Sequence, residues 1–169
     1  MYTVVSKQQF SEKVFKLEIT APLIARSRKA GHFVIVRLGE KGERVPLTIA
    51  GADVEKGTIT LVIQKVGHSS TSICDLGVGD QIADIVGPLG QATHIENFGT
   101  VVCAGGGVGV APMLPIIQAL KAAGNRVISV LAGRSKDLII LEEEVRKSSD
   151  EVVIMTDDGS YGTKGLVTE

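Results

Sequence analysis

The 169-residue sequence has no tryptophan, and aromatic residues make up only 4% of it, whereas glycine is frequent, with 20 residues. Much of the fold must therefore consist of tight turns and close backbone approaches, which proteins often use to hold a ligand. The two cysteines, Cys74 and Cys103, lie far apart in the sequence. They make neither a disulfide framework nor a zinc or iron–sulfur set within these residues, and a reducing cytoplasm is the expected location.

An excess of charge of either sign is also missing. Eighteen basic residues stand against 19 acidic ones, and the basic residues form no run. We therefore expect neither nucleic acid nor an anionic membrane as a partner. The N-terminus lacks the apolar segment of a signal peptide. The uncharged stretch from Asn97 to Leu120 is long enough to cross a bilayer, but its glycine turn would strand backbone polar groups in lipid, so no membrane span is expected.

The first half of the chain predicts a small antiparallel β-barrel. Short β-rich runs alternate with turn signals such as Ala21-Pro22, and Lys56-Gly57 is typical of a hairpin turn. Six such strands favour a barrel over an open sheet. The predicted strands are Tyr2–Phe10, Val14–Thr20, His32–Leu38, Val45–Gly51, Thr58–Gln64 and Gln81–Val86. A short helix is predicted over Ser69–Leu76, with Ser69 or Ser70 as its N-cap.

From Phe98 onwards, strands alternate with helices, which predicts a parallel sheet. The predicted strands are Thr100–Ala104, Arg126–Ala132 and Glu151–Thr156, and the predicted helices are Ala111–Ala123 and Leu138–Lys147. This makes half of a nucleotide-binding sheet. The sequence therefore predicts two domains, a six-stranded antiparallel β-barrel over residues 1–97 and a partial Rossmann-like α/β lobe over residues 98–169.

A glycine-rich turn joins the first strand of this lobe to its helix. Glycines let the backbone approach a pyrophosphate closely, and the helix N-terminus adds free N–H groups and a positive dipole. The spacing is not G-x-G-x-x-G, and a tight turn is the alternative interpretation. Four glycines within five residues, Gly105 to Gly109, exceed what a turn needs. We therefore predict that Gly106, Gly107, Val108 and Gly109 contact a dinucleotide.

The ends of the next two strands bear on nucleotide specificity, because the carboxyl ends of parallel strands form the ligand-binding edge of a sheet. Arg134 follows the second strand and is placed to contact phosphate. Asp157 and Asp158 follow the third strand, where carboxylates accept hydrogen bonds from ribose hydroxyls and repel a 2′-phosphate. This favours NAD over NADP. The alternative for the two aspartates is a turn before Gly159.

Several motifs, in order along the whole chain, resemble the ferredoxin–NADP reductase superfamily. They are RVPLTIA from Arg44, VGHSS from Val66, GPLG from Gly87, AGGGVGVAP from Ala104 and DDGSYGTKG from Asp157. These motifs are most similar to those of the branch that contains the small, FAD-carrying subunit of NADH-dependent reduced ferredoxin:NADP oxidoreductase (sulfide dehydrogenase). The electron-transfer subunit of dihydroorotate dehydrogenase is a near relative of that branch.

The resemblance implies FAD contacts at two barrel segments. A strand with an R-x-x-S/T pattern holds the flavin in this superfamily, which points to Arg44, Pro46, Leu47 and Thr48, with the Thr48 hydroxyl near the flavin ring. Here Val45 stands three residues before Thr48 and Arg44 stands four before it, which moves the arginine to the other face of a regular strand. Arg44 then contacts the pyrophosphate only through a bulge, and is otherwise a solvated charge.

The second segment matches at Gly67, Ser69 and Ser70, where a helix N-terminus takes the pyrophosphate in this superfamily. Simple helix capping by the two serines is the alternative. Members of the branch also carry a Cys-Gly-Pro-type segment and cysteines for a [2Fe–2S] centre. We find neither in these residues, so a [2Fe–2S] cluster is expected only in a segment after residue 169.

The function that the resemblance implies is electron transfer by a flavoprotein subunit. NAD(P)H reduces FAD, and single electrons pass to an iron–sulfur partner, either a larger subunit or ferredoxin. No Ser-His-Asp, Cys-His or paired-carboxylate set is recognisable, so we assign no catalytic residue and no metal ligand. Three alternatives stay open: the electron-transfer subunit of dihydroorotate dehydrogenase, a stand-alone ferredoxin–NADP reductase, and a non-catalytic docking module.

Overall fold

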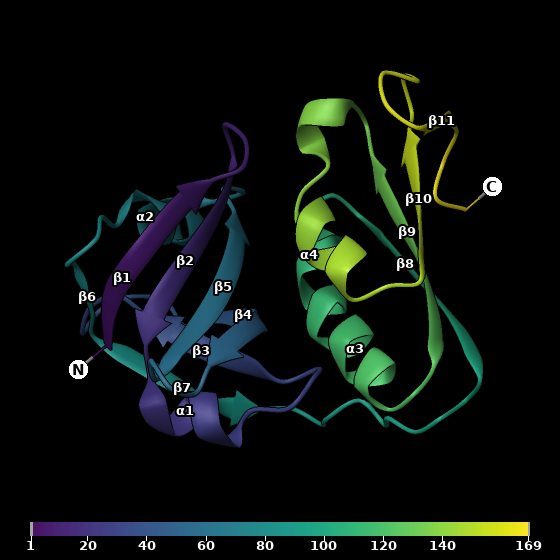
Figure 1. Cartoon of the computed structure of the whole chain (residues 1–169). Helices are drawn as coiled ribbons and strands as arrows, with labels where there is room; N and C mark the ends of the chain where they lie inside the picture. The colour runs from purple at the N-terminus through teal and green to yellow at the C-terminus, as the bar shows by residue number, and fades with distance from the viewer. Residues whose placement is uncertain (1, 169) are drawn as a thin grey trace. The chain divides into compact units, whose positions relative to one another are not determined.

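The first unit of the chain, up to Thr93, is a seven-stranded antiparallel sheet that curls into a nearly closed barrel (Figure 1). The computed structural model describes residues 2–168. The strand order is β6-β1-β2-β5-β4-β3-β7, and β6 and β7 at its two ends are separated in sequence only by Ala83. The strands are β1 (Tyr2–Gln9), β2 (Val14–Thr20), β3 (Phe33–Arg37), β4 (Val45–Asp53), β5 (Thr58–Gln64), β6 (Gln81–Ile82) and β7 (Asp84–Leu89).

Period-two alternation of apolar residues fills the barrel interior. In β2, Leu17 and Ile19 are fully buried, and Glu18 between them is half-exposed. The neighbouring strands add Ile49, Ile59 and Leu61 to the same core. Each such side chain contributes about 1.5–3 kcal/mol when it is fully removed from water. The core therefore lies inside the barrel, and the loops at its ends are free to carry a site.

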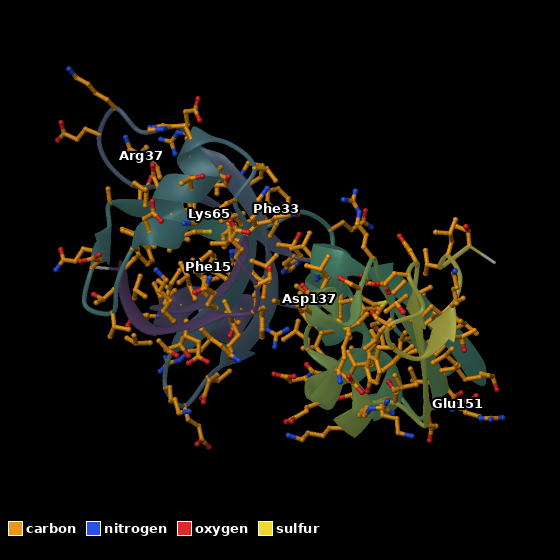
Figure 2. All side chains as sticks on the ribbon, turned by 90° about the horizontal axis from the view of Figure 1, so that it is seen from above. Phe15, Phe33, Arg37, Lys65, Asp137 and Glu151 are labelled. Carbon is orange, nitrogen blue, oxygen red and sulfur yellow. The ribbon has the colours of Figure 1, made fainter. Side chains whose placement is uncertain are left out.

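One of the few aromatic residues, Phe15, borders this core beside two lysines. The Nζ atom of Lys65 lies 4.9 Å from the ring centroid, and that of Lys7 lies 5.2 Å from it. Phe15 and Lys65 are labelled in Figure 2. Lys65 also pairs with Asp75 at 2.6 Å. Such cation–π contacts contribute about 0.5–1 kcal/mol each at exposed positions. The Lys65–Asp75 ion pair attaches the end of helix α2 (His68–Asp75) to the barrel wall.

The prediction for this unit needs three corrections. Helix α1 (Pro22–Ser27) was missed, because Ala21-Pro22 was interpreted as a turn, whereas Pro22 begins the helix in its first turn. The predicted strand Gln81–Val86 is two strands, β6 and β7, so the sheet has seven strands rather than six. Helix α2 begins at His68 with Gly67 as its N-cap, so neither Ser69 nor Ser70 is the N-cap residue.

The second unit, from His94, is a four-stranded parallel sheet in the order β11-β10-β9-β8. Figure 1 shows α3 and α4 on one face of this sheet. Buried Ile117 and Leu120 come from α3, and buried Val145 comes from α4. The elements are β8 (Thr100–Gly106), the 3₁₀ turn η1 (Gly107–Gly109), α3 (Val110–Ala122), β9 (Arg126–Gly133), the 3₁₀ turn η2 (Lys136–Leu138), α4 (Glu142–Lys147), β10 (Glu151–Thr156) and β11 (Thr163–Lys164).

The contacts divide the two units between Thr93 and His94, whereas the sequence placed the boundary after residue 97. Buried Asn125 explains why residues 96–98 belong with the sheet: its Nδ2 donates to the Glu96 carbonyl at 2.9 Å, and its Oδ1 accepts from the Phe98 N–H at 2.7 Å. Within residues 2–168, no helix is long and apolar enough to span a membrane.

Two predictions for the second unit are also wrong in detail. The predicted helix Leu138–Lys147 is interrupted, because Leu141 adopts the left-handed conformation with φ of 57°. Ile140 and Leu141 are both buried, so packing rather than helix propensity decides the backbone there. The sheet also gains a fourth strand, β11, which pairs with β10 through Met155 and Thr156.

Candidate functional site

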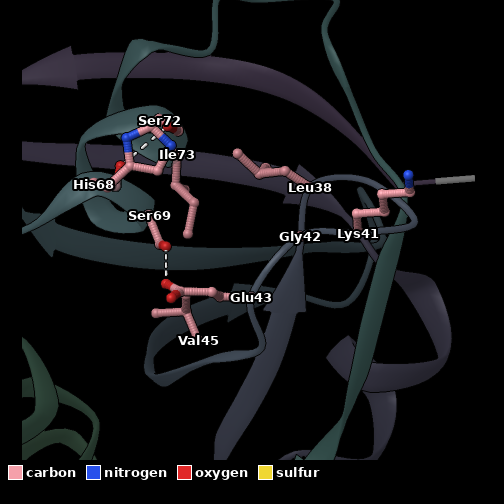
Figure 3. Close-up of a pocket in the computed structure, with 9 residues that line it drawn as sticks. All are labelled: Leu38, Lys41, Gly42, Glu43, Val45, His68, Ser69, Ser72 and Ile73. Atoms are coloured by element: carbon pink, nitrogen blue, oxygen red, sulfur yellow. Dashed lines mark hydrogen bonds between the residues drawn. The ribbon is translucent and has the colours of Figure 1, made fainter.

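A pocket of about 260 Å³ lies in the first unit between the β3–β4 loop and the start of α2 (Figure 3). Its apolar lining comes from Leu38, Val45 and Ile73, and its polar lining from Lys41, Glu43, His68, Ser69 and Ser72. Figure 3 shows the Ser69 hydroxyl donating to the Glu43 carboxylate across the pocket. Apolar walls with a few converging polar groups are typical of a small-molecule site.

The register of β4 decides where its predicted site residues point. Val45, Leu47 and Thr48 pair with Val36, Val34 and Phe33 of β3 without a register shift. The one irregularity of β4 lies beyond Thr48, between Ile49 and Gly51. Val45 and Leu47 pack against the barrel core, so by alternation Pro46 and Thr48 face the other way. Pro46 is exposed and Thr48 is half-buried.

Arg44 precedes β4, and no bulge returns it to the face of Val45. Its Nη1 lies 3.5 Å from Oδ2 of Asp84, and Nη2 of Arg37 lies 3.7 Å from the same oxygen. Val45, three residues before Thr48, is the residue that lines the pocket. The position where the resemblance expects arginine therefore faces the pocket, but it carries an apolar side chain.

Helix α2 is stabilised at its start by Ser70 rather than by Ser69. The Ser70 Oγ accepts from the N–H groups of Val66 and Gly67, each at 3.0 Å, and donates to the Gly67 carbonyl at 3.1 Å. This is the backward half of a capping box. The Ser69 hydroxyl instead points toward Glu43 and the pocket. The capping alternative thus describes Ser70, and Ser69 is directed to the site.

The glycine turn of the second unit forms a 3₁₀ turn directly before α3. Gly106 ends β8, and Gly107 has a φ of +52°, which favours glycine. No side chain caps the start of α3. A Cβ atom added at Gly107 or Gly109 would have no atom within 4 Å. The space beside both glycines is therefore open, with half-buried Val108 between them.

At the carboxyl edge of the sheet, β9 ends beside this turn, and β10 ends next to β9. Arg134 is exposed, and within residues 2–168 its guanidinium makes no hydrogen bond or ion pair. Asp158 is exposed too, but its Oδ1 accepts from the Ser160 N–H at 2.9 Å. Hydrogen bonds from Ser160 hold the pKa of the Asp158 carboxyl below its ordinary value. Asp158 is therefore a turn residue in part, while exposed Asp157 is free of this constraint.

Burial keeps both cysteines in the protonated form. Burial raises the pKa of the Cys74 thiol to about 11, and burial also raises the pKa of Cys103 on β8. Both side chains are thiols at neutral pH. Among residues 2–168, no three His, Cys, Asp or Glu side chains are grouped to hold a metal ion.

The structure brings only some of the predicted residues together. The pocket lining does not include the other predicted barrel residues, Arg44, Pro46, Leu47, Thr48, Gly67 and Ser70. Ser69 lines the barrel pocket beside the start of β4, and Gly106–Gly109, Arg134 and Asp158 share one edge of the parallel sheet. Sequence reasoning missed Glu43, Lys41 and His68 of the pocket. For Glu43 and Lys41 the available signal was their position in the charged loop immediately before Arg44, and for His68 its position between Gly67 and Ser69.

The known proteins that are similar to this chain include two electron transfer subunits and a ferredoxin-NADP oxidoreductase. A dihydroorotate dehydrogenase B (NAD(+)) electron transfer subunit homolog from Thermotoga maritima is 45% identical over 166 residues, which cover 98% of this chain and 58% of that protein. The corresponding subunit from Bacillus cereus is 31% identical, covering 98% and 66%. A chain in a structure of NADH-dependent reduced ferredoxin-NADP oxidoreductase is 42% identical with a TM-score of 0.95, covering 99% and 60%. No protein-family model matches the chain.

A barrel with a glycine-initiated helix, followed by a parallel sheet with a glycine turn, is the ferredoxin reductase-like fold. The chain belongs to the ferredoxin–NADP reductase superfamily. Within it, the chain is homologous to the electron transfer subunits of dihydroorotate dehydrogenase B and to NADH-dependent reduced ferredoxin-NADP oxidoreductase. It spans about six tenths of the length of these relatives.

Proposed function

We propose that this chain is the FAD- and NAD(P)H-binding part of an electron-transfer flavoprotein subunit. The barrel unit would hold FAD, and the sheet unit would hold the nicotinamide dinucleotide. The partner would be a larger catalytic or iron–sulfur subunit, or ferredoxin. The names of its relatives, an electron transfer subunit and a ferredoxin-NADP oxidoreductase, support this class of reaction.

The observation that carries the proposal is a pair of glycines that the fold does not require. Gly67 and Gly109 are the N-caps of α2 and α3, with φ of −159° and −65°, which any residue adopts. A Cβ atom added at either position meets no atom within 4 Å. Ser, Thr, Asp or Asn would cap these helices at least as well. A ligand that approaches the backbone closely explains both glycines, and phosphate is the group that such N–H donors bind best.

In the barrel unit, the start of α2 suits the pyrophosphate of FAD. The Ser69 hydroxyl lines the pocket, and the first N–H groups of α2 are free of intrahelical partners. Thr48 faces away from the core on β4 and supplies a hydroxyl for the flavin ring. When bound, FAD supplies the two-electron to one-electron redox chemistry. The residues of this unit bind and orient the dinucleotide and transfer no proton themselves.

In the sheet unit, the glycine turn and Arg134 provide complementary contacts to a dinucleotide. The space beside Gly107 and Gly109 is open, and the first N–H groups of a helix have no intrahelical partner. The Arg134 guanidinium, unpaired within residues 2–168, supplies positive charge at the same sheet edge. Asp157 and Asp158 supply acceptors for ribose hydroxyls. NADH is the preferred reductant on this arrangement, because a 2′-phosphate would meet two carboxylates.

The test is to purify the chain, release its flavin by heating and identify it. FAD at about one equivalent, with reduction by NADH under anaerobic conditions, supports the proposal. Thr48→Ala should change the flavin spectrum or lower the affinity for FAD about three- to tenfold, with an unchanged melting temperature. Colourless protein that takes up no FAD on reconstitution would overturn the proposal in favour of a docking module.

Dihydroorotate dehydrogenase B is a second candidate for the complex, because relatives at 45% and 31% identity carry its name. A co-purifying subunit that reduces the flavin with dihydroorotate would favour this candidate. A co-purifying iron–sulfur subunit that exchanges electrons with ferredoxin would favour the other one.

A further inference from the structure

In the barrel pocket, an acidic side chain already accepts the hydrogen bond of the hydroxyl donor. The Glu43 carboxylate accepts the hydrogen bond of the Ser69 hydroxyl (Figure 3). Within residues 2–168, Glu43 forms no ion pair with a cation. Lys41 lines the same pocket, but Figure 3 shows its side chain pointing away from Ser69. The negative charge of Glu43 therefore lies beside Ser69 without a close counter-charge.

The surrounding residues do not offset this charge either. Val45, three residues before Thr48, lines the pocket with an apolar side chain. Arg44 is directed to Asp84, with 3.5 Å between Nη1 and Oδ2. The pocket thus combines a hydroxyl donor suited to a phosphate with a carboxylate that disfavours one.

We propose that Glu43 competes with the pyrophosphate of the flavin dinucleotide for the Ser69 hydroxyl and so lowers the affinity of the barrel for FAD. The inference rests on the proposed function, because it assumes that FAD binds at this pocket. A hydroxyl donates one hydrogen bond at a time, so the carboxylate and a phosphate oxygen cannot both receive it. Two anions that share one donor also repel each other. Glu43 is thereby a residue that sets how readily the chain takes up its flavin.

The test compares FAD binding by the wild type, Glu43→Gln and Glu40→Gln at low salt. The first substitution keeps the size of the side chain and removes its charge. Glu40 lies in the same loop outside the pocket lining, so Glu40→Gln is a control for net charge. We expect Glu43→Gln to bind FAD about five- to tenfold more tightly and Glu40→Gln to match the wild type within about twofold. The gain should shrink as ionic strength rises.

Riboflavin, which has no phosphate, separates the phosphate effect from a general change of the pocket. Glu43→Gln should bind riboflavin as the wild type does. A double-mutant cycle with Ser69→Ala then assigns the effect to the shared hydroxyl, because most of the gain from Glu43→Gln should vanish in the Ser69→Ala background. Melting curves of all variants check that each one folds.

The outcomes distinguish this inference from the proposed function. If the wild type binds FAD and Glu43→Gln binds it equally or less tightly, only the inference is overturned. An equal gain for riboflavin overturns it as well. If neither the wild type nor Glu43→Gln binds FAD, the proposed function and the inference both fail.

Discussion

Helices α2 and α3 both begin at a glycine with open space in place of a side chain, but the two starts are built differently. At α2, Ser70 bonds the backbone of Val66 and Gly67, and Ser69 points toward the pocket. At α3, no side chain caps the helix, and a 3₁₀ turn of Gly107–Gly109 precedes it. One start is thus controlled by side chains, and the other by backbone alone.

This difference determines which substitutions should weaken binding at each site. A site built from hydroxyl and carboxylate side chains changes its affinity when one polar group is removed. A site built from backbone N–H groups has no such group to remove, and it responds only to added volume. Substitutions at the two helix starts, and at a glycine that the fold itself requires, separate the two kinds of site.

Gly162→Ala should destabilise the sheet unit by about 2–4 kcal/mol. Gly162 has a φ of +68°, and a Cβ atom there would collide with the Ile154 carbonyl oxygen. The strain has no flexible neighbour to relieve it, because the contact is with the backbone of β10. Urea unfolding measures the loss. Gly109→Ala is the matched control and should change stability by less than about 0.5 kcal/mol, so equal losses in the two variants would remove the distinction between required and open glycines.

Gly109→Leu should weaken NADH binding at least tenfold, which corresponds to about 1.4 kcal/mol. The leucine side chain would fill the space beside the backbone N–H groups of the turn, where no atom lies within 4 Å of an added Cβ. FAD content and melting temperature should stay the same. Fluorescence titration with NADH measures the affinity. Unchanged NADH binding would mean that the nucleotide does not use this turn.

Ser70→Ala should lower the free energy of unfolding by about 1 kcal/mol, because the Val66 and Gly67 N–H groups lose their acceptor. Ser69→Ala should cost less than about 0.5 kcal/mol and should lower FAD affinity instead. Denaturant unfolding and FAD titration of both variants check this reversal. If both serines affect stability alone, the start of α2 is only a capped helix.

The sequence predicted the barrel strands well, because alternation and turn residues are local signals. Leu17 and Ile19 in β2 show the expected period, and Gly57 with a φ of +65° closes the predicted hairpin. Local sequence signals gave wrong predictions where tertiary packing determines the backbone conformation. Buried Ile140 and Leu141 break the predicted helix, and Pro22 begins a helix where a turn was expected.

The site residues stay predictions, and their geometry could not be predicted from the sequence. Ser69 and Glu43 are 26 residues apart, so their contact depends on how the β3–β4 loop meets α2. The direction of Arg44 depends on the register between β3 and β4, which a single sequence does not reveal. The turn at Asp158 is a local structure, because its carboxylate accepts a hydrogen bond from the N–H of Ser160, two residues later. A turn was the alternative prediction for this residue.

The smallest expected effect concerns the choice between NADH and NADPH. We expect NADH to be preferred about three- to tenfold, because Asp157 and Asp158 repel a 2′-phosphate but are exposed and screened by salt. Arg134 opposes this preference, since its guanidinium is unpaired within residues 2–168. Asp157→Ser should remove more of the preference than Asp158→Asn, because hydrogen bonds from Ser160 engage the Asp158 carboxylate. The rate of flavin reduction by each cofactor, under anaerobic conditions and at two salt concentrations, measures the preference for NADH. Equal reduction by both cofactors in the wild type would mean that Arg134 offsets the two carboxylates, and Arg134→Gln should then restore the preference for NADH.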